Sequence, residues 1–229
     1  MYLGDAFKRV LVLSPHADDD VIGCGGLMKK IINNGGEVYV VITAIGDIDF
    51  YHLGRVVSKE ERKAELAKSL TYLGVTQYFT LFDNYESLMD TMPIRNVITS
   101  FEKIIGRLKP STVLLPYPSF HQDHKIVFNA GFAAVRPSPY NHDYLRLVAG
   151  YEYPFVFWSN ESINAGNLYI DITAELEDKL RAFKYHQSQV REGKHLLSSE
   201  AVGLWAEKRG LECGADYAEM FYILRMLVK

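Results

Sequence analysis

Apolar runs without polar interruption alternate, along most of the chain, with segments that repeat apolar residues at helical spacing. Runs rich in β-branched and aliphatic residues are typical of parallel strands that are covered on both faces. Strands are predicted at residues 9–13, 38–43, 77–82 and 112–116, and further along at 147–153 and 168–172. Because predicted helices separate these strands, we expect an α/β fold with a mostly parallel sheet covered by helices on both faces.

Start and stop signals support the predicted helices. Gly35 and Gly36 end a helix over residues 21–33, since glycine readily adopts the left-handed conformation that closes a helix. Ser58 and Glu61 form a capping box, in which Ser58 accepts the N3 amide hydrogen and Glu61 reaches back. Leu66, Leu70 and Leu73 continue that helix, and another helix covers residues 97–108 before Pro110. Further helices are predicted after His121 and after Thr173. Residues 217–227 fit either a strand or a helix.

Composition places the chain among ordinary globular proteins. Its 229 residues are 48% hydrophobic and 23% charged, so we expect a single domain over residues 1–229 with its own core. The net charge of −3 creates no broad positive field, which argues against nucleic acid as a partner. No apolar stretch approaches the roughly 20 residues of a membrane-spanning helix, so no integral membrane segment is expected.

Cysteine usage and the amino terminus predict a cytoplasmic protein. Only Cys24 and Cys213 are present, too few for a disulfide framework or a cysteine-based zinc site. The first residues lack the basic start and long apolar region of a secretory signal peptide. A reducing compartment is therefore the expected setting.

Two clusters of His and Asp follow predicted strands. Residues 16–20 (His-Ala-Asp-Asp-Asp) come after the first strand, and residues 121–124 (His-Gln-Asp-His) come after the fourth. In a sheet of order 3-2-1-4, strands 1 and 4 flank the reversal of strand order, where open α/β sheets bind ligands. Both clusters would then meet, and two His with one carboxylate suit a catalytic zinc that keeps a position for water.

Each cluster also has an ordinary interpretation. Asp residues after a strand commonly cap a helix, and a His in a loop is usually solvated or bonded to a carbonyl. A nucleotide-binding site is another interpretation of the first cluster, because Gly23, Gly25 and Gly26 follow it. Their spacing is not G-x-G-x-x-G, and three carboxylates would repel a pyrophosphate, so these glycines are expected to permit close helix-to-strand packing.

The two clusters resemble the motifs of a known family. Ser14-Pro-His-Ala-Asp-Asp-Asp20 is similar to the P-H-P-D-D-E motif, and His121-Gln-Asp-His124 to the H-P-D-H motif, of the LmbE-like, or PIG-L, zinc-dependent N-deacetylases. Ala17, Asp20 and Gln122 depart from those motifs. Weaker similarities lie at Arg62, Glu65, Leu73-Gly74, Ser188-Gln189 and Ala218-Glu219…Phe221. The resemblance implies a Rossmann-like enzyme that removes an N-acyl group from a small amino-sugar substrate.

The resemblance also implies which residues of the two clusters bind the metal and which one acts as the base. His16, Asp19 and His124 would be the metal ligands, and Asp18 the general base acting on the metal-bound water. This division agrees with geometry, because the side chains of neighbouring residues diverge and Asp18 cannot easily share one ion with Asp19. A carboxylate beside the metal can take the water's proton and hand it to the leaving amine.

Further roles fall on residues outside the ligand set. His121 is the expected oxyanion stabiliser, either charged or donating, and Asp123 is expected to orient it or hold its proton. Arg62 and Asp83 resemble positions that contact the sugar, against the alternatives of a helix-surface ion pair and a turn residue. Asp20 is expected to cap the helix or to support a ligand. His52, His142, His186 and His195 are expected to be surface or locally bonded residues.

Several choices stay open at this point. Zinc is the default metal, but two His and one carboxylate also accept Fe(II). The site would serve equally in an amidase acting on a thiol conjugate or another natural product. A nucleotide- or sugar-binding module without turnover belongs to a different class and would gain stability from its ligand rather than from zinc. The sequence is compatible with a homo-oligomer.

Overall fold

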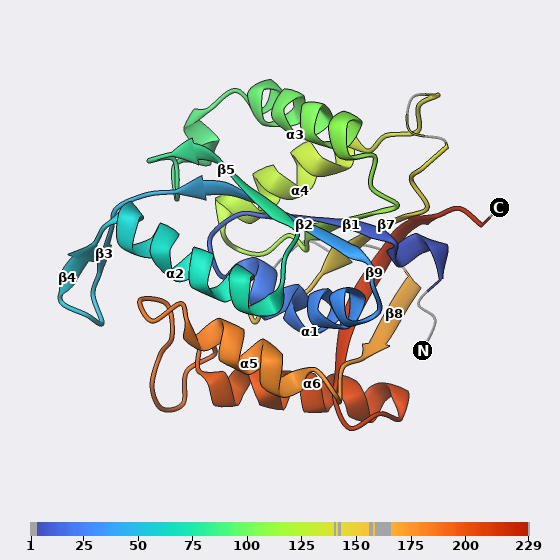
Figure 1. Cartoon of the computed structure of the whole chain (residues 1–229). Coiled ribbons are helices and arrows are strands. Elements are labelled where there is room, and N and C mark those ends of the chain that lie inside the picture. The colour runs from blue at the N-terminus through green and yellow to red at the C-terminus, as the bar shows by residue number, and fades with distance from the viewer. Residues whose placement is uncertain (1–3, 140, 142, 156–157, 159–165, 229) are drawn as a thin grey trace.

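One twisted sheet organises the chain, and the computed structural model describes residues 4–139, 141, 143–155, 158 and 166–228 (Figure 1). Among these residues, seven strands form the sheet in the order β5-β2-β1-β6-β7-β9-β8. They are β1 (Arg9–Ser14), β2 (Glu37–Ile45), β5 (Gln77–Asp83), β6 (Thr112–Pro116), β7 (Leu147–Tyr151), β8 (Gly166–Asp171) and β9 (Ala218–Met226). A separate hairpin pairs β3 (Ile48–Phe50) with β4 (Arg55–Val57).

The strand order confirms the prediction that decides where the site lies. β5, β2, β1, β6 and β7 are parallel, and β1 lies between β2 and β6, with Leu11 opposite both Tyr39 and Val113. This is the 3-2-1-4 order expected for the first four strands. β9 runs antiparallel between β7 and β8, so the sheet is mostly parallel with an antiparallel edge.

Helices cover both faces of the sheet, as the apolar runs predicted. They are α1 (Asp19–Asn33), α2 (Lys59–Leu73), α3 (Ile94–Leu108), α4 (Gln122–Ala134), α5 (Leu176–Lys184) and α6 (Ser199–Cys213), with short 3-10 helices η1 (Asp5–Phe7) and η2 (Met89–Thr91). Helices α3 and α4 lie on one face, and α1, α2, α5 and α6 lie on the other (Figure 1). Each layer buries its own apolar cluster against β1, β2, β6 and β7.

Helix termini follow the signals in the sequence, with one difference. Helix α2 begins after Ser58, whose hydroxyl accepts the Glu61 amide hydrogen at 3.2 Å, and ends at Gly74 in the left-handed conformation. The side chain of Glu61 does not complete the capping box, because it pairs with Arg55 on the neighbouring strand β4 at 2.7 Å. That hairpin was not predicted, so its competition for Glu61 was not foreseen.

Helix α1 packs closely on the sheet because it carries glycines where it crosses other elements. A Cβ on Gly23 would clash with the ring of Tyr151, and one on Gly26 would lie 2.7 Å from the side chain of Ile172. Glu219 of β9 adds a polar clamp: its carboxylate accepts the amides of Gly26 and Leu27 at 2.9 and 2.8 Å. Lys179 of α5 pairs with the same carboxylate at 2.7 Å.

Two parts of the chain were assigned differently or not at all from the sequence. Residues 217–227, which fitted either type of element, form strand β9. Helix α6 was not predicted, because its buried positions Val202, Ala206 and Gly210 form only a weak apolar stripe, while Leu204 and Leu211 are exposed. Among the described residues, no helix is both long enough and apolar enough to cross a bilayer.

Candidate metal centre

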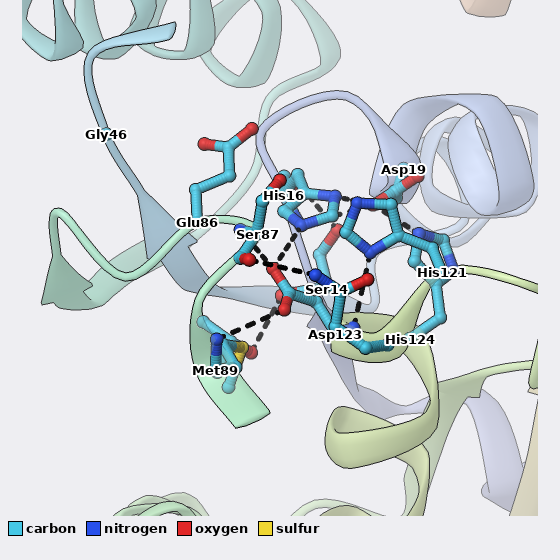
Figure 2. A network of polar contacts seen from close by, with 12 residues as sticks. Ser14, His16, Asp19, Gly46, Glu86, Ser87, Met89, His121, Asp123 and His124 are labelled. Atoms are coloured by element: carbon cyan, nitrogen blue, oxygen red, sulfur yellow. Dashed lines mark hydrogen bonds and ion pairs between the residues drawn. The ribbon is translucent and has the colours of Figure 1, made fainter. Parts of the chain in front are cut away.

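Both His/Asp clusters lie at the carboxyl ends of neighbouring strands. His16 follows β1 by two residues, and Asp18 and Asp19 occupy the N-cap and first position of α1. His121 is the N-cap of α4, and His124 lies in the first turn of that helix. Because β1 and β6 pair in parallel, the strand-end loops converge, and Figure 2 places His16, Asp19, His121 and His124 around one point.

His16, Asp19 and His124 form a compact set of donors. Asp19 Oδ2 lies 3.3 Å from His16 Nδ1 and 3.4 Å from His124 Nε2, and one candidate ligand atom of each residue lies within 4.8 Å of the others. All three side chains are buried. The backbone amide of His16 also donates to Asp19 Oδ2 at 3.1 Å, which fixes the carboxylate between the two rings.

The Asp123 carboxylate contacts His16 rather than the His121 ring that the sequence suggested. Its Oδ2 lies 2.8 Å from His16 Nε2, and its carboxylate also accepts the amides of Ser87 and Met89 at 2.6 and 3.2 Å (Figure 2). A ring nitrogen that donates to a carboxylate fixes the tautomer and orientation of the imidazole. With Nε2 directed at Asp123, His16 presents Nδ1 to the side occupied by Asp19.

The environment of the two remaining ionisable groups differs sharply. His121 Nδ1 accepts the amide of Asp123 at 3.2 Å, so its ring proton resides on Nε2 when the ring is neutral. Burial and the neighbouring charges of His16 and His124 lower the pKa of His121 to about 4. The charged alternative considered for this residue is therefore disfavoured, and the ring is a neutral donor through Nε2.

Asp18 keeps its carboxylate unengaged although the residue is only 6% exposed. It occupies the N-cap position of α1, yet its side chain makes no capping hydrogen bond, and none to any other residue described. Burial and the charge of Asp19 raise the pKa of Asp18 well above its usual range, while Arg62 acts in the opposite sense. A carboxylate in this state can exchange a proton with a ligand instead of with the protein.

Asp19 and His16 shift each other's pKa toward the charged forms. Burial alone would raise the pKa of Asp19, but His124 and His16 outweigh it and hold the pKa below its ordinary value. Burial alone would lower the pKa of His16, but hydrogen bonds to Asp123 and Asp19 raise it well above the ordinary value. Positive charge is thus favoured between these carboxylates, which is the electrostatic requirement of a cation site.

A comparison with known families decides the relationship that the motifs suggested. The family described as PIG-L: GlcNAc-PI de-N-acetylase matches residues 11–135, more than half of the chain, and the matched region contains both clusters. The chain belongs to the PIG-L family. The resemblance drawn from residues 14–20 and 121–124 is therefore confirmed.

Relatives of this PIG-L protein include sugar deacetylases. The chain is 28% identical to the diacetylchitobiose deacetylase of Thermococcus kodakarensis over 93% of this chain and 81% of that protein. It also resembles the solved structure of N,N'-diacetylchitobiose deacetylase from Pyrococcus horikoshii, at 25% identity and a TM-score of 0.76, covering 98% of this chain and 87% of that one.

The fold itself extends to another reaction class. The structure of a 4-carboxy-2-hydroxymuconate hydratase from Pseudomonas putida superposes with a TM-score of 0.73 at 19% identity, over 96% of this chain and 98% of that one. At this identity the likeness speaks for the α/β architecture alone. The architecture alone does not determine the reaction, which depends on the residues of the site.

Arg62 and Asp83 occupy different environments. Arg62 is 1% exposed, and its guanidinium pairs with Glu86 and reaches the carbonyl of Gly46, so it is not the helix-surface ion pair considered as an alternative. Its Nε lies buried without a hydrogen-bond partner among the described residues. Asp83, at the end of β5, is exposed and lies 2.9 Å from Lys63 on helix α2.

Two other residues near the ligands do not behave as expected. Asp20 neither caps α1 nor bonds to a ligand: both carboxylate oxygens are buried without a partner in the described structure, and burial beside Asp19 raises its pKa to about 7. His186 is only 1% exposed, so the alternative of a surface residue is wrong, and its Nε2 is buried without a hydrogen-bond partner among the described residues. Burial and the charge of Arg62 lower its pKa to about 3.

The other histidines outside the clusters have local surroundings. His195 Nδ1 accepts the amide of Leu197 at 3.0 Å, and the exposed His52 packs edge-on against Phe50. His142 lies outside the described residues. These two described rings therefore agree with the expectation of locally placed side chains.

Sequence reasoning missed residues that come to the site from other segments. Ser87 and Glu86 lie in the loop after β5, where Asn84 and Ser87 adopt positive φ angles of 64° and 61°. Tyr153 follows β7, and its ring packs on that of His124 at a centroid distance of 4.6 Å. The turn-forming Asp-Asn pair at 83–84 was a local signal for the loop after β5. No local signal indicated Tyr153.

Proposed function

We propose that this protein is a metal-dependent N-deacetylase that hydrolyses the acetamide of an N-acetyl amino sugar. The observation that carries the proposal is the buried set of His16, Asp19 and His124 beside the unengaged carboxylate of Asp18. Membership of the PIG-L family and similarity to a diacetylchitobiose deacetylase support an amino sugar as the substrate class.

The metal would be held by His16 Nδ1, Asp19 Oδ2 and His124 Nε2. Two imidazole nitrogens and a carboxylate oxygen suit zinc with a fourth position left for water, and they also suit Fe(II). A bound ion of this kind polarises the amide carbonyl and lowers the pKa of water to about 7. Zinc is our default assignment, and iron is the alternative that metal analysis must address.

Asp18 moves the proton in the proposed reaction. The water oxygen adds to the carbonyl carbon as Asp18 accepts the water's proton, and the C–N bond then breaks as Asp18 passes that proton to nitrogen. The products are the sugar amine and acetic acid, which ionise in water, so no further reactant is needed. The Asp18 carboxylate accepts no hydrogen bond from the described residues, which supports this role, because a bonded carboxylate would be a weaker base.

His121 and Asp123 support the reaction in different ways. His121 Nε2–H is free to donate to the carbonyl oxygen as negative charge develops there, because Nδ1 is already engaged with the Asp123 amide. The Asp123 carboxylate holds His16 through Nε2 and so orients a metal ligand. Asp123 is thus assigned a positioning role on His16 in place of the expected one on His121.

Sugar contacts are proposed for Arg62 and Asp83. Arg62 has one donor, Nε, without a partner among the described residues, and its charge opposes the rise in the pKa of Asp18, which supports a role close to the proposed base. The Asp83 carboxylate is shared with Lys63 and Lys59 at 2.9 and 3.4 Å, so a sugar hydroxyl would have to compete with two lysines. Arg62 therefore has the stronger structural support.

The proposal also concerns the setting of the enzyme. A small-molecule N-acyl amino sugar fits the acidic net charge better than nucleic acid does. The use of only two cysteines, with the described Cys24 buried and Cys213 exposed and neither bonded, supports a cytoplasmic location. A homo-oligomer is compatible with these features.

Hydrolysis of defined substrates tests the proposal. Protein stripped with a chelator and reloaded with zinc or Fe(II) is assayed for acetate and free amine from N-acetylglucosamine, diacetylchitobiose, an N-acetylated thiol conjugate and a simple acetamide. We expect activity on an amino sugar that requires the metal. Hydrolysis of the thiol conjugate alone, or a rise in melting temperature with nucleotides but not with zinc, would overturn the assignment.

The variant Asp18→Asn, paired with Asp20→Asn, isolates the base. Asp18→Asn should retain its metal and lose activity by about 10² to 10⁴, the usual contribution of a positioned base. Asp20→Asn is the matched control, because it removes a buried carboxyl from the same turn of α1 that has no assigned role, and it should stay within about threefold of the wild type. Equal losses in both variants would contradict the role of Asp18.

A further inference from the structure

Tyr153 is placed over the metal centre by the sheet. β7 pairs in parallel with β6, and residues beyond Tyr151 therefore emerge at the same edge as the loop that leads to His124. The Tyr153 ring packs on the His124 ring at 4.6 Å, tilted by 46°, and Phe155 packs on Tyr153 at 5.5 Å. The ring is thus held between a proposed metal ligand and a second aromatic side chain.

The hydroxyl of Tyr153 has no hydrogen-bond partner among the described residues, although the side chain is mostly buried. A tyrosine with this degree of burial usually finds a partner for its O–H. The phenol lies within electrostatic range of the charges of Asp19, Asp18 and Arg191. The Tyr153 ring therefore brings a hydroxyl without a described partner close to His124.

The adjacent residue fixes the backbone at this point. Glu152 is buried and accepts hydrogen bonds from Arg209 Nε at 2.8 Å, Trp205 Nε1 at 3.1 Å and Tyr222 O–H at 3.2 Å. Successive side chains of an extended segment point to opposite sides, so Glu152 faces α6 while Tyr153 faces the metal centre. The hydrogen bonds of Glu152 therefore fix the backbone at Tyr153, and the position of Tyr153 does not depend on substrate.

We propose that Tyr153 is a catalytic residue whose hydroxyl donates a hydrogen bond to the carbonyl oxygen of the substrate as that oxygen becomes negative. His121 and Tyr153 both pack on the His124 ring, at 5.6 and 4.6 Å, so two neutral donors border the place where the amide meets the metal. Two donors aimed at one developing oxyanion form the usual arrangement for stabilising a tetrahedral intermediate. The inference rests on the proposed deacetylase function.

Tyr153→Phe tests this role because it removes the hydroxyl and keeps the ring on His124. We expect kcat to fall by about 10², the effect of losing one oxyanion donor, with KM within twofold of the wild type. The variant should bind a methylphosphonamidate analogue of the amino sugar, which mimics the tetrahedral intermediate, at least tenfold more weakly by calorimetry. Zinc content and melting temperature should not change.

Tyr222→Phe is the matched control, since it removes a tyrosine hydroxyl from the Glu152 network and leaves the metal centre alone. It should retain kcat and affinity for the analogue. An unchanged kcat in Tyr153→Phe, a rise in KM alone, or a loss of zinc would each overturn the inference, since they indicate no role, a sugar contact or a structural role. Absence of amino-sugar hydrolysis by the wild type would instead overturn the proposed function.

Discussion

Residues 11–135 and residues 136–228 contribute different things to the same site. The first region, which matches the PIG-L family, supplies His16 from a loop and Asp19 and His124 from the first turns of helices that follow parallel strands. The second region supplies no member of the donor set; it brings the Tyr153 ring and the buried Glu152 network through an antiparallel edge. The proposed ligands and the proposed base thus come from the first region, and the second region adds one proposed donor, Tyr153, with the network that holds its backbone.

The difference teaches where each property is encoded. A donor placed at the carboxyl end of a parallel strand needs only the strand order to find its partners, and here that order is β2-β1-β6. The Glu152 network needs α6 and β9 to pack correctly, because its members lie 53 to 70 residues further along the chain. Substitutions in the two regions should therefore fail in different ways.

Asp19→Ala should produce the largest effect. It removes the carboxylate that lies between His16 and His124, so two donors would remain for the metal. We expect a loss of kcat/KM of about 10³ or more, because several kcal/mol of charge stabilisation depend on the ion, and bound zinc below a tenth of an equivalent by elemental analysis. A variant that keeps stoichiometric zinc would break the assignment of donors to the first region.

Arg209→Met should act on stability and not on the metal. It leaves the buried Glu152 carboxylate with Trp205 and Tyr222 as its remaining donors, and breaking a buried charge pair costs about 3 kcal/mol or more, measured by urea unfolding. Lys208→Met is the matched control: its pair with Glu212 is exposed, so we expect less than about 0.5 kcal/mol. Loss of zinc in folded Arg209→Met protein would contradict the assignment of metal binding to the first region alone.

Asp123→Asn should have an intermediate effect. The amide can still meet His16 Nε2, but it lacks the charge of the carboxylate that orients this ligand. Removing such a partner of a metal ligand typically costs 10- to 100-fold in metal affinity, which a competition titration with a chromophoric chelator measures. An unchanged zinc affinity would contradict the positioning role of Asp123.

Ser58→Ala should have the smallest effect of the four, and it shows that the first region also carries purely structural residues. Its hydroxyl caps α2, and loss of such a cap costs about 1 kcal/mol. Glu61→Ala should cost less than about 0.5 kcal/mol, because Glu61 forms an exposed pair with Arg55 instead of closing the capping box. Equal losses of stability in Ser58→Ala and Glu61→Ala, measured by thermal unfolding, would favour the reciprocal capping box that the sequence suggested.

Much of the fold and the donor set could be predicted because both depend on local patterns. Apolar runs defined strands β1, β2 and β6, and the strand-order rule brought residues 16–20 to residues 121–124. The partner of Asp123 could not be predicted in the same way. It depends on how the loop after β5 delivers the Ser87 amide, and on which side of the His16 ring faces that loop.

The unpredicted elements share a physical reason. Helix α6 buries small residues such as Ala206 and Gly210, so its apolar stripe is too weak to recognise without its neighbours. β9 carries apolar residues on both faces, since Phe221 belongs to one apolar cluster and Leu224 packs on the other, and this hides the two-residue alternation of an antiparallel strand. Tyr153 follows a strand without any motif, and only the pairing of β6 with β7 reveals its closeness to His124.

The clamp of Glu219 on α1 has a consequence for synthesis of the protein. All three proposed ligands have been made once residue 124 is complete, but the helix that begins at Asp19 receives the Glu219 carboxylate only when strand β9 emerges. Domains generally fold as units during translation. A nascent chain would thus carry all three residues well before the last strand fixes helix α1, so the helix that presents Asp19 receives its full support only late in synthesis.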